Sequence, residues 1–228
     1  MAEKYKYKIS NIEVVGHVTK IFLLPIKEKM DFNAGQYVYA KFNHPDISDE
    51  YHPFSIASAA HEEEIVLGIK SIGDFTSTLH KLKIGDIADI EGPYGSFDYK
   101  KFSQKSQIWI AGGIGITPFL SFLSSLQKDL DEYDIILFYS VKNDANNYFI
   151  KDIKDKISKI NTSKVRLFNI ISDKDGRLDI HKIKKEGTME NTAFLLCGSN
   201  EMSTSLIEQL KKEGVNQSQI AYEDFSMK

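Results

Sequence analysis

The sequence contains a single cysteine and no long apolar run. One cysteine, Cys197, among 228 residues excludes an internal disulfide, and it excludes a cysteine-ligated iron–sulfur cluster or a cysteine-rich zinc site held by this chain alone. The six histidines show neither an HExxH motif nor a paired spacing, so we expect no metal site. No stretch reaches about 18 consecutive apolar residues, so we expect no membrane span.

An excess of charge of one sign is also lacking. The formal net charge of −3 and the isoelectric point near 6.1 argue against a nucleic-acid surface. Residues 1–10 lack the apolar core of a secretion signal, so we expect a cytoplasmic location. The hydrophobic share of 42% and the charged share of 27% are typical of a soluble globular protein, and 228 residues are enough for two modest domains.

Residues 1–102 carry short runs of β-branched and aromatic residues, separated by turn signals such as Gly16 and Gly92-Pro93. These runs predict six strands, at residues 5–15, 18–24, 36–42, 52–57, 65–71 and 88–91. One helical segment is expected at residues 75–82. Six short strands within about a hundred residues suggest a small closed antiparallel barrel.

Residues 103–228 alternate strands with helices instead. The strands are expected at residues 108–111, 135–141, 165–171, 193–197 and 219–222, and the helices at residues 117–130, 148–160, 180–185 and 202–212. Such alternation predicts a parallel sheet with helices on both faces. The fold class is therefore β plus α/β, with a six-stranded barrel domain at residues 1–102 followed by a parallel-sheet domain at residues 103–228.

The stretch IWIAGGIGITPFLSFL, residues 108–123, joins the first strand of the second domain to its first helix. Gly112, Gly113 and Gly115 form the turn, and we expect Thr117 as the helix N-cap with Pro118 as the first helical residue. Glycines let a backbone approach a pyrophosphate closely, and a helix start offers free N–H groups. The alternative is a tight turn that binds nothing.

Ligands of parallel sheets bind at the carboxyl ends of the strands. The glycine turn, Ser140, Cys197-Gly198 and the tail from Glu223 to Phe225 all fall at such ends. Four independent features at one edge favour a nucleotide site more than any one motif does. Taken alone, Cys197 is also explained as a small buried hydrophobic residue, the usual role of a lone cysteine.

Two stretches of the first domain also suggest ligand binding. In His52-Pro53-Phe54-Ser55 the proline removes a ladder donor, so we expect this strand at a sheet edge or a bulge. There Phe54 can cover an aromatic ring, and Ser55 can hydrogen-bond to its rim. Residues 73–77, GDFTS, offer a second glycine and hydroxyl helix start able to hold phosphate. The alternatives are that Phe54 is a core residue and that residues 73–77 only cap a helix.

These motifs follow one another along nearly the whole chain: an aromatic–serine strand, GGIGITP, a Cys-Gly after a late strand, and a Glu-x-aromatic near the C-terminus. Together they resemble the ferredoxin–NADP reductase superfamily. The strand motif is most similar to that of the flavin domains of ferric reductases and NADPH oxidases, where His-Pro-Phe is followed by serine or threonine. The resemblance implies that the barrel binds FAD, that the second domain binds NADH or NADPH, and that hydride passes from nicotinamide to flavin.

The resemblance also implies a role for individual residues. It implies three catalytic residues, with Ser55 near the flavin N5 and Cys197 and Glu223 beside the nicotinamide C4. It implies that Phe54 packs on one face of the isoalloxazine and Phe225 on the other. The remaining flavin contacts that it implies are His52, Pro53, Ile69, Lys70, Ser71, Gly73, Phe75 and Thr76. The remaining nicotinamide-nucleotide contacts are Gly112, Gly113, Gly115, Thr117, Ser140, Lys142 and Gly198, with Lys142 or Arg177 as the reader of a 2′-phosphate.

Three functions are consistent with this resemblance. The first is an NAD(P)H-dependent flavoprotein oxidoreductase whose acceptor is ferredoxin or another redox protein, free flavin, a ferric chelate or a quinone. The second is an electron-transfer module or subunit of a larger complex, serving a haem or iron–sulfur partner without a substrate of its own. The third is a flavin-binding sensor without catalysis, which the joint presence of Ser55, Cys197 and Glu223 disfavours.

Overall fold

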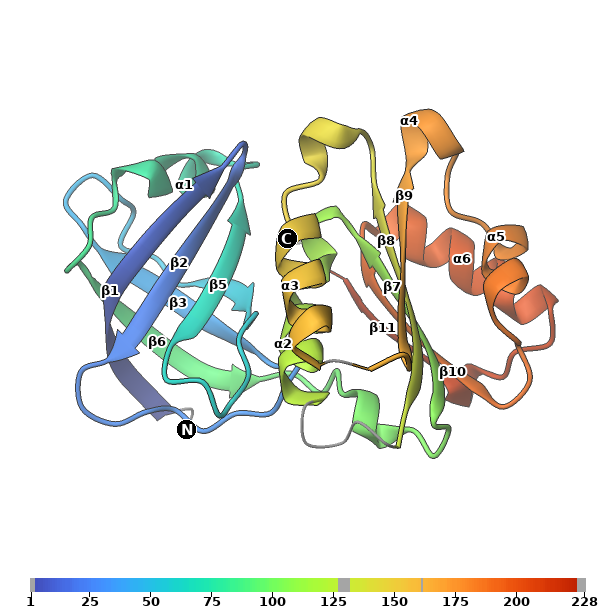
Figure 1. The fold of residues 1–228 in the computed structure, drawn as a ribbon. Coiled ribbons are helices and arrows are strands. Elements are labelled where there is room, and N and C mark those ends of the chain that lie inside the picture. Colours follow the sequence, from blue (N-terminus) through green and yellow to red (C-terminus); the bar gives the residue numbers. More distant parts are fainter. Residues whose placement is uncertain (1–2, 127–131, 161, 225–228) are drawn as a thin grey trace. The chain divides into compact units, whose positions relative to one another are not determined.

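The computed structural model describes residues 3–126, 132–160 and 162–224 (Figure 1). The chain divides into two compact units with separate cores. The barrel unit comprises the chain up to Asp98 together with Leu120–Ser125. The sheet unit comprises Tyr99–Phe119 and the chain from Leu126 onward. No helix in the described residues combines the length and the hydropathy needed to cross a membrane.

The barrel unit is built on six antiparallel strands. They are β1 (Glu3–Val15), β2 (Val18–Pro25), β3 (Tyr37–Asn43), β4 (His52–Ser55), β5 (Ile65–Lys70) and β6 (Ile87–Tyr94), with the short helix α1 (Asp74–Thr78) and the 3₁₀ turn η1 (Leu79–Lys81) between β5 and β6. The strand order is β4-β3-β6-β1-β2-β5, so β4 and β5 are the edges. A bridge between Ile56 and Leu67, just beyond β4, brings these edges together. The sheet is a nearly closed barrel, as predicted.

Alternating side chains explain the core of the barrel. Val38 and Ala40 in β3 are fully buried, and the residues between and beside them are less buried. Ala88 and Ile90 repeat this pattern in β6. Because successive side chains of a strand point to opposite faces, each strand gives one apolar face to the interior.

The sheet unit is built on five parallel strands. They are β7 (Ser106–Gly112), β8 (Asp134–Val141), β9 (Val165–Ile171), β10 (Thr192–Gly198) and β11 (Ile220–Asp224), in the order β11-β10-β7-β8-β9. The helices are α2 (Thr117–Ser125), α3 (Ile150–Ile160), α4 (Ser172–Asp175), α5 (Ile180–Glu186) and α6 (Asn200–Lys212). Figure 1 shows α3 on one face of this sheet and α5 and α6 on the other, as the alternating pattern predicts.

Different helices pack on the two faces of the parallel sheet. Ile108 and Ile110 of β7 share a core cluster with Ile183 of α5 and Leu206 of α6. Trp109 points to the opposite face, where its ring centroid lies 5.8 Å from that of Phe119 in α2. Central strands such as β10 are buried along their whole length, which explains why they read as continuous apolar runs.

Helix α2 is shared between the units. Its first turn belongs to the sheet unit, whereas Leu120–Ser125 belong to the barrel unit. Within the barrel unit Ser121 Oγ donates a hydrogen bond to Ser58 O at 2.6 Å, and the Phe122 ring stacks on Phe97 with centroids 5.5 Å apart. Both contacts tie the second half of α2 to the barrel.

The structure differs from the sequence-based predictions at one capping residue and in one additional helix. Thr117 is not the N-cap but the first residue of α2, with helical φ and ψ of −55° and −47°, because Gly113–Ile116 already form a 3₁₀ turn, η3, that leads into the helix. The single-turn helix α4 was not predicted. The predicted end of α2 near residue 130 lies outside the described residues.

Candidate functional site

Strand β4 has the edge position that Pro53 predicts. In the register with β3, Ser55 lies opposite Tyr37 and Pro53 opposite Tyr39. Two buried polar atoms of β4, His52 Nε2 and Ser55 Oγ, have no hydrogen-bond partner among the described residues. Because buried polar atoms are nearly always paired, two orphaned atoms on one short strand point to a bound group.

Phe54 points into the barrel rather than away from it. Its side chain is 8% exposed and belongs to the core cluster of the barrel unit. Its ring centroid lies 6.4 Å from that of Phe75, which packs against the same cluster. This placement favours the core alternative for most of the Phe54 ring, and its contact with a flavin face stays a prediction.

The imidazole of His52 lies against Phe75. The two ring centroids are 3.6 Å apart and the ring planes differ by 24°. Burial lowers the pKa of His52 below its ordinary value of 6.5, although Glu50 Oε2, 3.7 Å from Nε2, acts in the opposite direction. Burial therefore favours the neutral form of His52, whose ring offers one N–H donor and one acceptor nitrogen.

The end of β5 leads into the predicted phosphate loop. Ile69 is 3% exposed and packs in the core, Lys70 is partly exposed, and Ser71 is exposed. Ser71 N donates to His17 O at 2.8 Å, which continues the pairing of β5 with β2 by one residue. The side chains of Lys70 and Ser71 are thus free to face solvent or a ligand, whereas that of Ile69 is not.

Thr76 holds the loop that precedes α1. Its Oγ1 accepts hydrogen bonds from Ile72 N at 2.9 Å and from Gly73 N at 3.1 Å. A Cβ atom added to Gly73 would meet nothing within 4 Å, so the loop is open at this glycine. The hydroxyl of Thr76 is therefore occupied by the backbone, and any phosphate contact in this loop falls to the open side at Gly73.

The glycine turn packs tightly against the end of β10. A Cβ atom on Gly115 would lie 2.3 Å from Cys197 O, and one on Gly112 would lie 3.4 Å from the Cα atom of Gly198. Gly113 has φ +54°, a left-handed conformation, and a Cβ atom added there would meet nothing within 4 Å. The turn and the Cys197-Gly198 pair therefore form one local structure, in which the glycines allow close backbone approach.

The register of the sheet brings the predicted site residues of the second domain to one edge. Gly112 at the end of β7 lies beside Ser140 of β8. Cys197 in β10 lies beside Ala111 of β7 on one side and Glu223 of β11 on the other. Four strands thus end at one carboxyl edge with a glycine, a hydroxyl, a thiol and a carboxylate.

Cys197 is a buried functional group, and Glu223 is a half-buried one with a buried carboxylate oxygen. The Cys197 side chain is fully buried, and Glu223 Oε2 is buried with no hydrogen-bond partner in the described residues. Burial raises the pKa of Glu223 from its ordinary value of 4.5 to about 7. The carboxyl group is therefore able to hold or release a proton near neutral pH.

Three cations lie near the ends of β8 and β9, and two of them are paired. Lys174 Nζ lies 2.5 Å from Asp144 Oδ2, and Arg177 Nη1 lies 2.6 Å from Glu201 Oε1. Lys142 is exposed and has no side-chain partner among the described residues. Of the two predicted readers of a 2′-phosphate, Lys142 is the unpaired one.

Three buried amide oxygens near this edge were not predicted. Oδ1 of Asn143, Asn147 and Asn169 lacks a hydrogen-bond partner in the part of the chain that the structure describes. Asn169 lies beside Tyr139 of β8. The sequence carried two signals for them: the asparagine inside the otherwise largely apolar run VRLFNII, and the amide-rich run NDANN. Phe225 lies outside the described residues.

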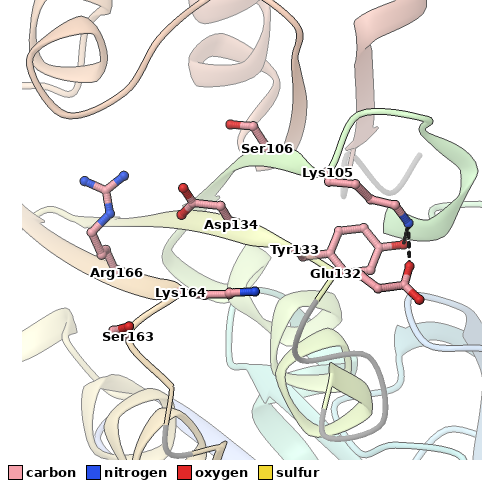
Figure 2. A pocket seen from close by; sticks show the side chains of 8 residues that line it. All are labelled: Lys105, Ser106, Glu132, Tyr133, Asp134, Ser163, Lys164 and Arg166. Atoms are coloured by element: carbon pink, nitrogen blue, oxygen red, sulfur yellow. Dashed lines mark hydrogen bonds and ion pairs between the residues drawn. The ribbon is translucent and has the colours of Figure 1, made fainter.

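A hollow of about 420 Å³ lies at the opposite, amino-terminal edge of the same sheet (Figure 2). Its lining residues are Lys105, Ser106, Glu132, Tyr133, Asp134, Ser163, Lys164 and Arg166. Lys105 Nζ bonds to Glu132 Oε2 at 2.6 Å and lies over the Tyr133 ring. We assign no nucleotide to this hollow, because parallel sheets bind ligands at their carboxyl edge.

Family models and a solved structure match both units. The model of the oxidoreductase FAD-binding domain matches residues 6–99, and that of the oxidoreductase NAD-binding domain matches residues 109–207. A ferredoxin NADP⁺ reductase from Neisseria gonorrhoeae with bound FAD and NADP has a similar fold, with a TM-score of 0.81 at 20% identity over 98% of this chain and 99% of that chain. Residues 6–99 thus belong to the family of oxidoreductase FAD-binding domains, and residues 109–207 belong to the family of oxidoreductase NAD-binding domains.

The sequence relatives include a flavohemoprotein and an electron transfer subunit. The flavohemoprotein of Bacillus subtilis (strain 168) is 27% identical over 222 residues, which are 91% of this chain and 55% of the relative. A probable dihydroorotate dehydrogenase B (NAD(+)), electron transfer subunit, of Pyrococcus furiosus is 29% identical over 218 residues, which are 93% of this chain and 78% of that subunit. The chain spans about half the length of the first curated relatives that it matches.

The residues of this reductase fit both nucleotides. In the barrel unit, the orphaned atoms of His52 and Ser55 and the open backbone at Gly73 suit a flavin nucleotide. In the sheet unit, the open Gly113 and the orphaned oxygen of Glu223 suit a nicotinamide nucleotide. The two matched families give the chain an oxidoreductase FAD-binding domain followed by an oxidoreductase NAD-binding domain.

Proposed function

We propose that residues 1–102 hold FAD, that residues 103–228 hold NADH or NADPH, and that the chain delivers electrons from the nicotinamide to a separate acceptor. The observation that carries this proposal is the carboxyl edge of the sheet unit, where Gly112, Cys197 and Glu223 lie on adjacent strands. FAD, when bound, accepts a hydride from the nicotinamide and releases the two electrons one at a time.

The barrel unit binds and orients the flavin in this proposal. Ser55 Oγ, buried and without a partner among the described residues, hydrogen-bonds to the rim of the flavin ring. His52 Nε2 hydrogen-bonds to the diphosphate, and the backbone at Gly73 lets a phosphate approach closely. Phe54 and Phe75 form the apolar wall beside these polar atoms.

The sheet unit presents the nicotinamide. The turn at Gly112 and Gly113 receives the pyrophosphate of the dinucleotide. Cys197 has a small side chain, which leaves room for a flat ring to approach. Glu223, with its pKa near neutrality, hydrogen-bonds to the nicotinamide side as a donor when protonated and as an acceptor when ionised.

The first experiment is an anaerobic titration of the FAD-loaded protein with NADH and then NADPH, followed by flavin absorbance. We expect rapid bleaching by at least one nucleotide. The Cys197→Ser variant should keep its flavin but be bleached more slowly, whereas Ser205→Ala on the exposed side of α6 should behave as the wild type. A protein that cannot be loaded with FAD, or that is bleached by neither nucleotide, contradicts the proposal.

The acceptor is the second part of the proposal. We favour a redox-protein acceptor, because reductase components and an electron transfer subunit are among the relatives. A small-molecule acceptor, such as a free flavin or a ferric chelate, is the alternative for a stand-alone enzyme. Steady-state turnover with a ferric chelate or free flavin would support the stand-alone enzyme; fast bleaching without such turnover would support the module. A cytoplasmic site for this exchange is also a proposal, which cell fractionation tests.

A further inference from the structure

The contact between His52 and Phe75 joins two segments of the barrel unit that both belong to the proposed flavin site. His52 begins β4, and Phe75 is the second residue of α1. Their rings overlap nearly in parallel, with centroids 3.6 Å apart. Phe75 also approaches Phe54, so one aromatic ring contacts both aromatic side chains of the His-Pro-Phe-Ser strand.

The Nε2 atom of His52 is held in place by the packing of the imidazole ring and not by a hydrogen bond of its own. This nitrogen is buried and has no hydrogen-bond partner in the described chain. Glu50 Oε2, at 3.7 Å, is beyond hydrogen-bond distance, and its side chain is 73% exposed. A buried ring nitrogen without a partner is unfavourable, so the orientation of this ring is maintained by its neighbours until a ligand pairs with it.

The position of Phe75 is in turn fixed by the loop around it. Thr76 Oγ1 accepts from the backbone N–H groups of Ile72 and Gly73, which locks the residues on either side of Phe75. Gly73, two residues before Phe75, is open to solvent. The same short segment therefore carries both the open backbone and the ring that covers His52.

We propose that Phe75 is a positioning residue, whose ring holds the His52 imidazole in the orientation in which Nε2 hydrogen-bonds to the flavin diphosphate. The inference rests on the proposed function and adds a residue that acts through another rather than by touching the phosphate itself. A stacked aromatic contact contributes about 0.5–1.5 kcal/mol beyond the area that it buries, which corresponds to a change of about 2- to 12-fold in affinity.

A double-mutant cycle on FAD binding tests this role. The dissociation constant of FAD is measured by quenching of flavin fluorescence for the flavin-free wild type, Phe75→Leu, His52→Ala and the double variant. We expect Phe75→Leu to weaken binding about 2- to 12-fold, and we expect it to add nothing once His52 has been removed. Independent, additive losses would overturn the inference.

Rescue and a matched control separate positioning from a loss of folding. Phe75→Trp keeps a ring over His52 and should restore affinity to within about twofold of the wild type. Phe168→Leu removes a comparable stacked ring, 5.3 Å from Phe138 in the sheet unit, and should leave FAD affinity unchanged. Equal weakening by Phe75→Trp and Phe75→Leu contradicts the inference alone, whereas a wild type that binds no FAD contradicts the proposed function as well.

Discussion

Replacing Glu223 by glutamine should stabilise the protein above pH 7. Burial raises the pKa of this carboxyl group from 4.5 to about 7. Below pH 4.5 both the folded and the unfolded chain hold the proton, and the group makes no difference to stability. Between pH 4.5 and about 7 only the folded chain holds it, so the free energy of unfolding falls as the pH rises.

The size of the effect follows from the same two values. Each tenfold change in proton affinity corresponds to about 1.4 kcal/mol, so the rise from 4.5 to about 7 corresponds to about 3 kcal/mol once the pH exceeds 7. Glutamine keeps the shape and does not ionise. Of the values between pH 5 and pH 8, the Glu223→Gln variant should therefore gain least on the wild type at pH 5 and gain up to about 3 kcal/mol at pH 8.

Urea unfolding of the nucleotide-free protein at pH 5, 6.5 and 8 measures this gain. Trp109, the only tryptophan, is fully buried in the sheet unit and reports the unfolding of the unit that contains Glu223. Glu208→Gln, at an exposed position of α6, is the matched control. Parallel pH profiles for the wild type and Glu223→Gln would refute the reasoning, because they would mean that the carboxyl group titrates alike in both states.

Three further predictions concern the turn, the phosphate loop and the choice of nucleotide. Gly115→Ala should destabilise the sheet unit by about 1–3 kcal/mol in urea, because its Cβ would meet a backbone oxygen 2.3 Å away; an unchanged midpoint would show that the turn can shift. Thr76→Val should cost about 1–2 kcal/mol and weaken FAD binding by losing an acceptor for two backbone N–H groups, and Thr76→Ser should restore both measurements; failure of serine to do so would assign the effect to packing. Lys142→Ala should raise KM for NADPH about fivefold and leave KM for NADH unchanged, because an exposed cation contributes up to about 1 kcal/mol to an ion pair. Lys174→Ala, which removes a lysine already paired with Asp144, is its control, and equal shifts with both nucleotides would exclude Lys142 as the phosphate reader.

The fold followed from the sequence where a local pattern decides the structure. The β-branched and aromatic runs of β3 and β6 and the unbroken apolar run of β10 predicted strands of the barrel and of the parallel sheet within a few residues of their ends. Pro53 predicted an edge strand, because a missing N–H is tolerated there. In each case a local pattern carries the whole physical reason.

Two other features of the fold could not be predicted from the sequence. Threonine is a common N-cap residue, yet Thr117 is the first residue of α2 itself. The reason is that the glycines before it form a 3₁₀ turn that packs against Cys197. Helix α4 is a single turn, and Asp175 Oδ2 accepts a hydrogen bond from Ile171 N at 2.8 Å, a local interaction that no periodicity marks.

The candidate site shows the same division. The sheet edge was predictable, because parallel strands carry their carboxyl ends to one side and Ser140, Cys197 and Glu223 each follow an apolar run. The stack of Phe75 on His52 was not, since it depends on how α1 folds over β4. The inward placement of Phe54 and the raised pKa of Glu223 also depend on burial that only the folded chain defines.

The division of α2 has a practical consequence for anyone who wishes to cut the protein into its parts. A fragment that stops after residue 102 would keep all six barrel strands but lose Leu120–Ser125. Ser58 O would lose the hydroxyl that it accepts from, and Phe97 would lose the ring that covers it. Such a fragment should expose apolar side chains that α2 normally covers and should be prone to aggregate. The barrel unit is therefore best expressed together with α2.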